Sequence, residues 1–485
     1  MTLAQRSVRS AGYTIASSGL QAVVQFVRAI ILARLLLPQH FGVYAYASSF
    51  VLLTSALPNF GMGAALIHRT RQSEGEIARR VHFTLLTLFS LLWGIVLALT
   101  CTWFLAPENR WVLWVVLGSN VISNLSMTGA VTLARQVAFR RVAVVQAANT
   151  LLGSSAAIFL AWNGVGLWSL VITDVISAVV VITGYYLIRP VWRPRFGWDR
   201  GIGAYLLGFG RRNMLAIVLL QALDHIDDLW TGAFLGKTAL GFYSRAYTFA
   251  TYPRKLLASP VNQVATSTYA ALKEQPKRLS QAFFRVNALL IRSGFFIAGL
   301  LFLLAPEFIH FVIGDKWLPM MTTFRLMLVY TLLDPIKVTI GNVFIAMGEP
   351  EKVVRARAWQ MVIMLGGLFT LGNLWGIEGV ALTADIMLIA GIGLLLWQVR
   401  VHVQFSLWRL FGPPLLALGV GLGAAGLTRQ LAYDSALLTQ VAWKSIAFMA
   451  GYLLPLGLME HGQWRAMLAT GINLLKPDSQ PHRTP

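Results

Sequence analysis

Charged side chains that could bind an ion lie inside long apolar segments of this sequence. In the first segment Gln21, Gln25 and Arg28 are spaced so that an α-helix would place all three on one face. A guanidinium on such a face offers a forked set of donors that matches phosphate oxygens. The face therefore predicts a polar cavity that holds a diphosphate. In the alternative interpretation Arg28 pairs with a carboxylate of a neighbouring helix and only holds the helices together.

Three carboxylates stand close together in the seventh apolar segment, where Asp224 and Asp228 are one helical turn apart and Asp227 lies between them. Carboxylates this close cannot all ionise cheaply in a low dielectric, so one holds a proton or the group binds a cation. The cluster is a candidate for coupling to an ion gradient. The alternative is that these acids neutralise basic residues of the first and eighth segments.

The eighth segment carries Arg245, Arg254 and Lys255, and Arg34 lies near the end of the first segment. Nine residues separate the two arginines of the eighth segment, which places them about half a turn out of phase in a straight helix. They face one cavity only if Pro253 bends the helix.

Several other kinds of chemistry are excluded. Cys101 is the single cysteine, so neither an intrachain disulfide nor a cysteine metal site can form. The stretch from Gly232 to Thr238 has the wrong spacing for a phosphate-binding loop, and no strand precedes it. The histidines are scattered without metal-ligand spacing, and no Ser/His/Asp arrangement is present. We therefore expect no metal, no cofactor and no enzymatic activity.

The composition predicts the elements that position these charges. Apolar residues make up 56% of the chain and charged residues 12%, about half the charged fraction of a soluble domain. The net charge of +21 comes from short basic clusters between apolar runs, which argues against nucleic acid binding. Fourteen segments are long enough to span a bilayer. They are residues 11–37, 41–67, 81–105, 112–134, 142–162, 165–188, 213–235, 239–272, 283–304, 320–347, 354–374, 377–399, 410–427 and 437–459.

The distribution of Lys and Arg predicts the orientation of these segments. Of the 40 basic residues, 27 fall in the even-numbered connections and the two tails, and only four fall in the odd-numbered connections. Because basic residues collect on the cytoplasmic side, both termini are expected in the cytoplasm.

A weak internal repeat supports a two-lobed organisation. At an offset of 199 residues, Phe41-Gly42-Val43-Tyr44 aligns with Leu240-Gly241-Phe242-Tyr243. Transporters are often built from such repeats. We predict an all-α integral membrane protein with two pseudo-symmetric six-helix lobes, at 1–200 and 201–402, two further helices at 403–465 and a cytoplasmic tail at 466–485.

Five stretches, in a constant order and spacing, are typical of one protein family. They are ARLLLPQHFG at 33–42, NFGMGAALI at 59–67, FLGKTALGFYSRAY at 234–247, GDKWLP at 314–319 and GEP at 348–350. On these stretches the sequence resembles the Wzx-type flippases of the polysaccharide transporter family, within the multidrug/oligosaccharidyl-lipid/polysaccharide exporter superfamily.

The resemblance implies that the protein moves an undecaprenyl-diphosphate-linked oligosaccharide from the cytoplasmic to the periplasmic leaflet of the bacterial inner membrane, for exopolysaccharide or O-antigen assembly. It implies alternating access around a cationic cavity, with the lipid bilayer and the polymerase and export proteins of the pathway as partners. The residues that would line this cavity are Arg28, Arg34, Arg245 and Arg254 at the diphosphate, with Gln21 and Gln25 beside them.

Two kinds of alternative remain. Another exporter of the superfamily, such as a drug/cation antiporter or a lipid II flippase, would have a similar layout. A membrane polysaccharide polymerase or ligase would be expected to have a long periplasmic loop, whereas the longest outer gap here, 305–319, is fifteen residues.

Overall fold

The computed structural model describes residues 3–68, 75–101, 103, 107–136, 139–188, 190, 192–431 and 437–460. Side chains are described for these residues except at 3–16, 68, 108, 139, 212, 213, 215, 216, 254–257, 260, 263, 429–431 and 437. The regular elements of the described residues are all helices, which confirms the predicted all-α class.

The chain divides into two compact units. Unit 1 contains residues 1–270 and 305–399, and unit 2 contains residues 271–304 and 400–485. The predicted lobes at 1–200 and 201–402 both fall largely within unit 1, and their boundary stays a prediction. The predicted tail at 466–485 lies outside the described residues.

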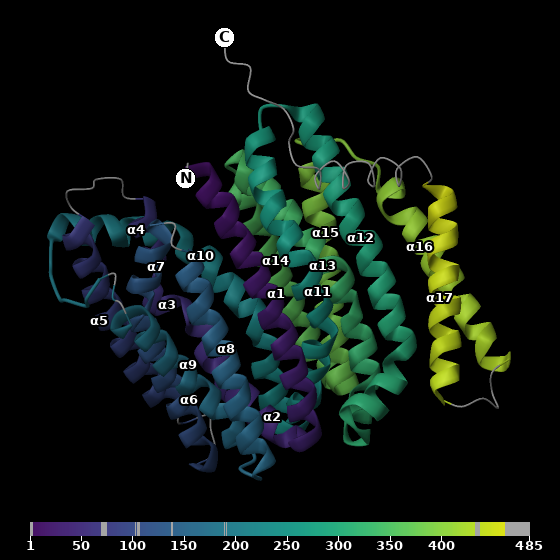
Figure 1. Ribbon diagram of the computed structural model, residues 1–485, viewed down its shortest axis with the longest axis horizontal. Coiled ribbons are helices and arrows are strands. Elements are labelled where there is room, and N and C mark those ends of the chain that lie inside the picture. Colours follow the sequence, from purple (N-terminus) through teal and green to yellow (C-terminus); the bar gives the residue numbers. More distant parts are fainter. Residues whose placement is uncertain are drawn as a thin grey trace. The chain divides into compact units, whose positions relative to one another are not determined.

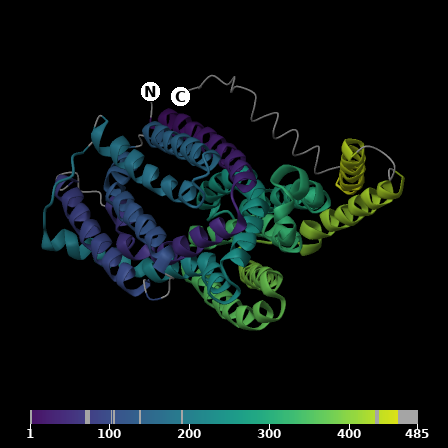
Figure 2. The same cartoon turned by 90° about the horizontal axis from the view of Figure 1, so that it is seen from below.

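Unit 1 begins with an N-terminal set of helices, drawn in purple and blue in Figure 1. They are α1 (Leu3–Leu35), α2 (Pro38–Thr54), α3 (Ala56–Asn59), α4 (Met62–His68), α5 (Gly75–Cys101), α6 (Pro107–Leu125), α7 (Met127–Arg135), α8 (Phe139–Trp162), α9 (Trp168–Ile182) and η2 (Thr183–Leu187). Within this set α1 lies alongside α8, as Figures 1 and 2 both show.

A C-terminal set of helices completes unit 1. These helices are α10 (Arg200–Trp230), η3 (Thr231–Leu235), α11 (Lys237–Leu272), η4 (Phe308–Ile313), η5 (Asp315–Met320), α13 (Met321–Met347), α14 (Pro350–Gly367), η6 (Leu368–Gly372) and α15 (Asn373–Val399). The backbone of α15 is broken near its start, because Gly376 adopts φ 58° and ψ −136°.

Unit 2 consists mainly of α12 (Pro276–Glu307, whose last three residues belong to unit 1), α16 (Leu407–Leu431) and α17 (Leu437–Met459). α16 and α17 pack against each other. A buried ion pair joins α12 to the end of α17, where Nε of Arg292 donates to Oε2 of Glu460 at 2.5 Å. The hydroxyl of Tyr452 donates to the carbonyl oxygen of Arg292 at 2.8 Å, so α17 contacts this residue of α12 through its backbone as well.

The predicted apolar segments fall on helices throughout the described residues. Segment 437–459 coincides with α17, whereas segment 41–67 is divided into α2, α3 and α4. Phe60 interrupts this second segment because it adopts a left-handed backbone conformation, with φ 47°. The sequence pattern thus locates apolar stretches well but does not show breaks within them.

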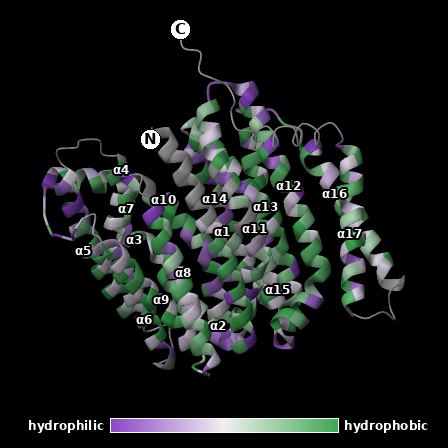
Figure 3. Ribbon diagram, in the orientation of Figure 1, coloured by the Kyte–Doolittle hydropathy of each residue, from purple (hydrophilic) through white to green (hydrophobic). Residues whose placement is uncertain are grey.

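Eleven stretches of the described residues are long and apolar enough to cross a membrane. One of them, Pro350–Val399, is 50 residues long and contains both α14 and α15. On α5 the side chains of Leu88, Leu92, Ile95 and Leu99 are all more than half exposed, and they follow one another at helical spacing. Figure 3 shows hydrophobic colour along most of the helices, as on α12 and α17. Such exposed apolar faces indicate that lipid surrounds this multi-pass membrane protein.

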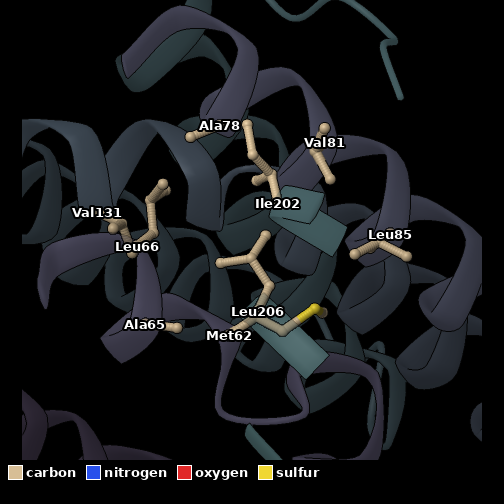
Figure 4. Packing of buried hydrophobic residues seen from close by; sticks show 9 residues of the cluster. All are labelled: Met62, Ala65, Leu66, Ala78, Val81, Leu85, Val131, Ile202 and Leu206. Carbon is tan, nitrogen blue, oxygen red and sulfur yellow. The ribbon is translucent and has the colours of Figure 1, made fainter. Parts of the chain in front are cut away.

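The start of α10 packs within the N-terminal set of helices. Ile202 and Leu206 are buried in a cluster with residues of α4, α5 and α7, which Figure 4 shows as sticks. The other end of α10 packs in the C-terminal set, where the ring of the buried Trp230 lies against Gly372 of η6. The helix therefore extends from one set to the other.

Candidate functional site

Arg28 is held between α1 and α9. Its Nη2 donates to Oγ1 of Thr173 at 2.9 Å, and the side chain is half-buried. The next residue of α9, Asp174, accepts a hydrogen bond at 3.0 Å from the hydroxyl of Tyr44 on α2. Arg28 lies within electrostatic range of both Asp174 and Tyr44. Three helices of the N-terminal set thus bring a cation, a carboxylate and a phenol together.

Arg245 approaches the same place from α11. Its guanidinium carbon lies 4.6 Å from the ring centre of Phe41, and it is within electrostatic range of Arg28, Tyr44 and Asp228. Among the described residues its Nε is buried without a hydrogen-bond partner. We call Arg28, Tyr44, Asp174, Asp228 and Arg245 the central group.

The central group holds two cations without a direct ion pair to either. In the part of the chain that the structure describes, neither Arg28 nor Arg245 has a carboxylate oxygen within 4.0 Å. Asp174 accepts a hydrogen bond from Tyr44, and Oδ2 of Asp228 lies 3.4 Å from Oγ of Ser49, whose hydroxyl also donates to the carbonyl oxygen of Ala45 at 2.8 Å. Two guanidinium groups near each other in a low dielectric favour an anion between them. The geometry is suited to binding an anion that arrives from outside the protein.

The three predicted acids, Asp224, Asp227 and Asp228, have different surroundings in the structure. The hydroxyl of Tyr243 donates to Oδ2 of Asp227 at 2.5 Å, and the backbone N–H of Asp228 donates to Oδ1 of Asp227 at 3.0 Å. Asp228 belongs to the central group, as described above. Asp224 is exposed and lines a separate cavity within the C-terminal set of helices.

This C-terminal cavity has a volume of about 290 Å³ and is lined in part by Asp224, Tyr330, Asp334, Lys337 and Arg357. Nζ of Lys337 lies 2.6 Å from Oδ1 of Asp334, an ion pair between residues at i, i+3 spacing on α13. Arg357 is within electrostatic range of Asp224. Apolar side chains make up much of the remaining lining, and these residues include two acids and two bases, so the cavity brings titratable groups of both signs together.

The two predicted glutamines belong to α1 and are not bonded to the central group by any contact among the described residues. Nε2 of Gln21 donates to Oγ of Ser17 at 2.8 Å, and that Oγ donates to the carbonyl oxygen of Ala143 on α8 at 3.3 Å. Gln21 therefore takes part in the contact between α1 and α8. Gln25 is half-buried on α1, one turn before Arg28.

Arg34 is engaged with backbone carbonyl groups. Its Nε donates to the carbonyl oxygen of Val312 at 2.6 Å, and its Nη2 donates to that of Phe311. In return, Nζ of Lys316 donates to the carbonyl oxygen of Arg34 at 2.7 Å. The structure therefore uses Arg34 to join the end of α1 to η4 and η5. The side chain of Arg254, the fourth predicted arginine, lies outside the described residues.

The starts of α2 and α11 touch through their backbones, in a contact that we call the seam, formed by Pro38, Gly42, Lys237 and Gly241. A Cβ atom on Gly42 would lie 1.6 Å from the carbonyl oxygen of Lys237, and one on Gly241 would lie 2.0 Å from that of Pro38. Both positions therefore require glycine. Each glycine and each carbonyl is 199 residues from its counterpart, so the two contacts are equivalent under the offset found in the sequence.

Sequence reasoning missed the residues that hold the charges in place. Thr173, Tyr44 and Tyr243 make the hydrogen bonds described above, yet each belongs to a type that is common in membrane helices. The repeat carried a usable signal, because Tyr44 and Tyr243 are 199 residues apart and each donates to an aspartate. The repeat could not identify the two aspartates that accept these hydrogen bonds, because Asp174 and Asp227 are not related by the offset of 199 residues.

The sequence matches a family model described as polysaccharide biosynthesis protein over residues 31–322. The succinoglycan biosynthesis transport protein ExoT of Rhizobium meliloti (strain 1021) is 27% identical over 327 residues, which are 65% of this chain and 64% of the relative, slightly less than two thirds of its length. The lipopolysaccharide biosynthesis protein WzxC of Escherichia coli (strain K12) is 21% identical over 400 residues, 79% of this chain and 78% of that protein. The teichuronic acid biosynthesis protein TuaB of Bacillus subtilis (strain 168) is 22% identical over 443 residues, 88% of this chain and 90% of that protein.

Solved structures show the same fold at low sequence identity. The lipid II flippase MurJ in an inward closed conformation superposes with a TM-score of 0.76 at 14% identity, over 94% of this chain and 99% of that one. An inward-facing multidrug resistance MATE family transporter gives a TM-score of 0.63 at 16% identity, over 79% of this chain and 94% of that one. Since the family model covers more than half of the sequence, this chain belongs to the polysaccharide biosynthesis protein family, and it shares its fold with these solved structures.

Proposed function

We propose that this protein flips an undecaprenyl-diphosphate-linked oligosaccharide from the cytoplasmic to the periplasmic leaflet of the bacterial inner membrane. Relatives named for succinoglycan transport and for lipopolysaccharide and teichuronic acid biosynthesis support a substrate of this class. The exported units would serve exopolysaccharide or O-antigen assembly, with the polymerase and export proteins of that pathway as partners.

The observation that carries this proposal is the approach of Arg28 and Arg245 within the central group. They come from α1 and α11, and neither is paired directly with a carboxylate among the described residues. A diphosphate placed between them would accept hydrogen bonds from both forks and would neutralise two charges that repel each other. The polyprenyl tail would stay in the surrounding lipid during this step.

We further propose fourteen crossings, arranged as lobes at 1–200 and 201–402 with two more helices at 403–465. The eleven candidate stretches become twelve when α14 and α15 are counted separately. The helices α10 and α11 have 31 and 36 residues, lengths of about 46 and 54 Å, so each exceeds the hydrocarbon thickness despite its charges. Counting them gives fourteen, and an even number of crossings agrees with both termini in the cytoplasm.

Alternating access follows from the seam in this proposal. In this proposal the backbone contact between α2 and α11 would close the central group on one side, which we take from the basic-residue pattern as the periplasmic side. Substrate would enter from the cytoplasmic side and leave after the seam separates.

We assign ion coupling to Asp224, Asp227 and Asp228. Asp228 is in the central group, Asp227 is its neighbour, and Asp224 lines the C-terminal cavity. A proton or cation taken up by these acids would change the charge of α10, the helix that reaches both sets.

The proposal is tested by deleting the gene and measuring lipid-linked oligosaccharide in each leaflet, using spheroplasts and a membrane-impermeant probe of the sugar. We expect the oligosaccharide to accumulate in the cytoplasmic leaflet and polymer export to stop. Export and leaflet distribution equal to those of the parent strain would contradict the proposal. Loss of lipid II from the periplasmic leaflet, with normal polymer, would identify a lipid II flippase instead.

A further inference from the structure

A basic cavity of about 640 Å³ lies entirely within unit 2, and none of its lining residues belongs to the central group. It is formed by the start of α12, the connection at 400–406 and the start of α16. Neither the predicted site residues nor the proposed transport step uses it.

Four cations line this basic cavity. Lys277 and Arg285 come from α12, Arg400 follows α15, and Arg409 lies in the first turn of α16. All four side chains are exposed, and the described residues that line the cavity include no carboxylate. The cavity therefore carries an uncompensated positive charge that attracts anions.

The walls of the cavity are fixed to each other. The backbone N–H of Gln404 donates to Oγ of Ser280 at 2.9 Å, so the connection is attached to α12. The guanidinium carbon of Arg400 lies 5.8 Å from the ring centre of Phe405, and that ring lies 5.3 Å from the ring of Phe283. These contacts hold the cations around a preformed opening, so binding would order few additional groups.

An apolar rim lies beside the cations. Val401, Leu407 and Trp408 are 80%, 40% and 69% exposed. Tryptophan is enriched at the level of lipid headgroups, and α16 begins its candidate span at Leu407. The cavity is therefore at the depth where phosphate groups of lipids lie, with apolar side chains positioned to meet acyl chains.

We propose that the basic cavity binds the phosphate headgroup of an anionic phospholipid. The leaflet is the cytoplasmic one, and this assignment of the leaflet rests on the proposed orientation of the chain. A resident phospholipid fits better than the transported lipid, because the cations are spread over two helices and a connection. Basic pockets between membrane helices on this side bind anionic headgroups through several modest contacts.

The test uses the purified full-length protein, delipidated in detergent and titrated with dioleoyl phosphatidylglycerol or dioleoyl phosphatidylcholine while bound lipid is counted by native mass spectrometry. We expect preferential retention of phosphatidylglycerol, weakened by salt. The variants Arg400→Gln and Arg409→Gln, singly and together, should lower its affinity by roughly fivefold per cation removed. Arg211→Gln and Arg278→Gln are matched controls, because both residues are exposed and neither lines the cavity.

Several outcomes would overturn the inference. They are equal retention of the two phospholipids, an undiminished preference in the double variant, or an equal loss in the control variants. Stronger retention of undecaprenyl diphosphate than of phosphatidylglycerol at the same residues would assign the cavity to the transported lipid. Displacement of phosphatidylglycerol by millimolar pyrophosphate alone would show a free-anion site.

If the double variant fails to fold, each single variant and the salt dependence of the wild-type protein still decide the question. Arg28→Ala should retain phosphatidylglycerol normally, so failure of the flippase proposal would leave this result unchanged.

Discussion

The chemistry of the central group depends on guanidinium geometry as well as on charge. Nη2 of Arg28 donates a hydrogen bond to Thr173, and this bond orients the guanidinium group. Nε of Arg245 has no hydrogen-bond partner among the described residues. A lysine would keep the charge at either position but would lose the planar set of donors. Comparing the substitution to lysine with the substitution to alanine therefore separates the electrostatic contribution of each arginine from its hydrogen-bonding contribution.

We expect Arg28→Ala and Arg245→Ala each to reduce flipping by roughly 10- to 100-fold, because a charge-assisted hydrogen bond contributes about 1.5–3 kcal/mol. Arg28→Lys should retain an intermediate rate. Flipping is measured as the appearance of oligosaccharide in the periplasmic leaflet, normalised to protein abundance. Arg195→Ala, an exposed arginine outside the site, should transport normally. Wild-type rates in both alanine variants would exclude the central group as the diphosphate site.

The second residue-scale prediction concerns ion coupling. Asp224→Asn removes a titratable group from the C-terminal cavity without changing its size, so flipping should lose most of its dependence on a proton or sodium gradient. The measurement is the flipping rate in proteoliposomes with imposed gradients of each ion. Glu351→Gln, at an exposed carboxylate, serves as the control. An unchanged gradient dependence in Asp224→Asn would remove that residue from the coupling mechanism.

The sequence predicts charged residues better than it predicts their partners. Arg28 was identified because a cation within an apolar segment is costly and therefore conspicuous. Arg34 has the same sequence signature, yet its donors bind the carbonyl oxygens of Phe311 and Val312. Nearly 280 residues separate these groups, and only the tertiary fold decides which cation faces the central group. Local spacing contains no information on such contacts.

At the scale of elements, the seam joins α2 to α11 through peptide groups. An added methyl group at Gly42 would overlap the carbonyl oxygen of Lys237, so the two helices would have to move apart. A backbone carbonyl group cannot avoid the added methyl group by changing rotamer, as a long side chain can. The packing of the seam is therefore specific for glycine.

We expect Gly42→Ala to open the seam and lower the flipping rate. The opening is measured by the reactivity of Ser48→Cys, a buried position on α2, with a water-soluble maleimide in a Cys101→Ser background. Gly366→Ala is the matched control, because a Cβ atom there meets nothing within 4 Å. Equal maleimide reactivity in Gly42→Ala and in the control would mean that the seam does not close access to the interior.

The boundaries of the elements were largely predictable, and their breaks were not. Apolar length places α8 and α17 within a few residues of the predicted segments. The left-handed Phe60 and the break at Gly376 arise from packing and backbone torsion, for which hydropathy carries no signal. The helix that contains Pro253, α11, continues through this residue from Lys237 to Leu272.

At the scale of the whole molecule, the number and direction of crossings can be tested with reporter fusions. Alkaline phosphatase fused after Gly236 or Asp315 should be active, and green fluorescent protein fused after Lys273 or Gln404 should fluoresce. This pattern requires α10 and α11 to cross the membrane in opposite directions, with the basic connections in the cytoplasm. Phosphatase activity after Lys273 would contradict the proposed topology.

The low fraction of charged residues and the length of the apolar segments together predicted a membrane protein. The internal repeat indicated that two parts of the chain have a similar structural arrangement. The division into compact units was not predictable, because it depends on how α12 packs with the last two helices. That grouping joins residues 271–304 with residues that follow position 399. A division of the sequence into consecutive segments cannot describe a unit that is built from two separate segments.

The path of α10 has a mechanical consequence. Ile202 and Leu206 anchor one end among α4, α5 and α7, Trp230 anchors the other end against η6, and three aspartates lie near the second anchor. Both sets belong to unit 1, and a helix attached to each of them would be strained by any rotation of one set against the other, so it would have to bend or detach at one end. Under the proposed ion coupling, neutralising an aspartate would change the forces on α10, and the energy of an ion gradient would reach both sets of helices as a mechanical load.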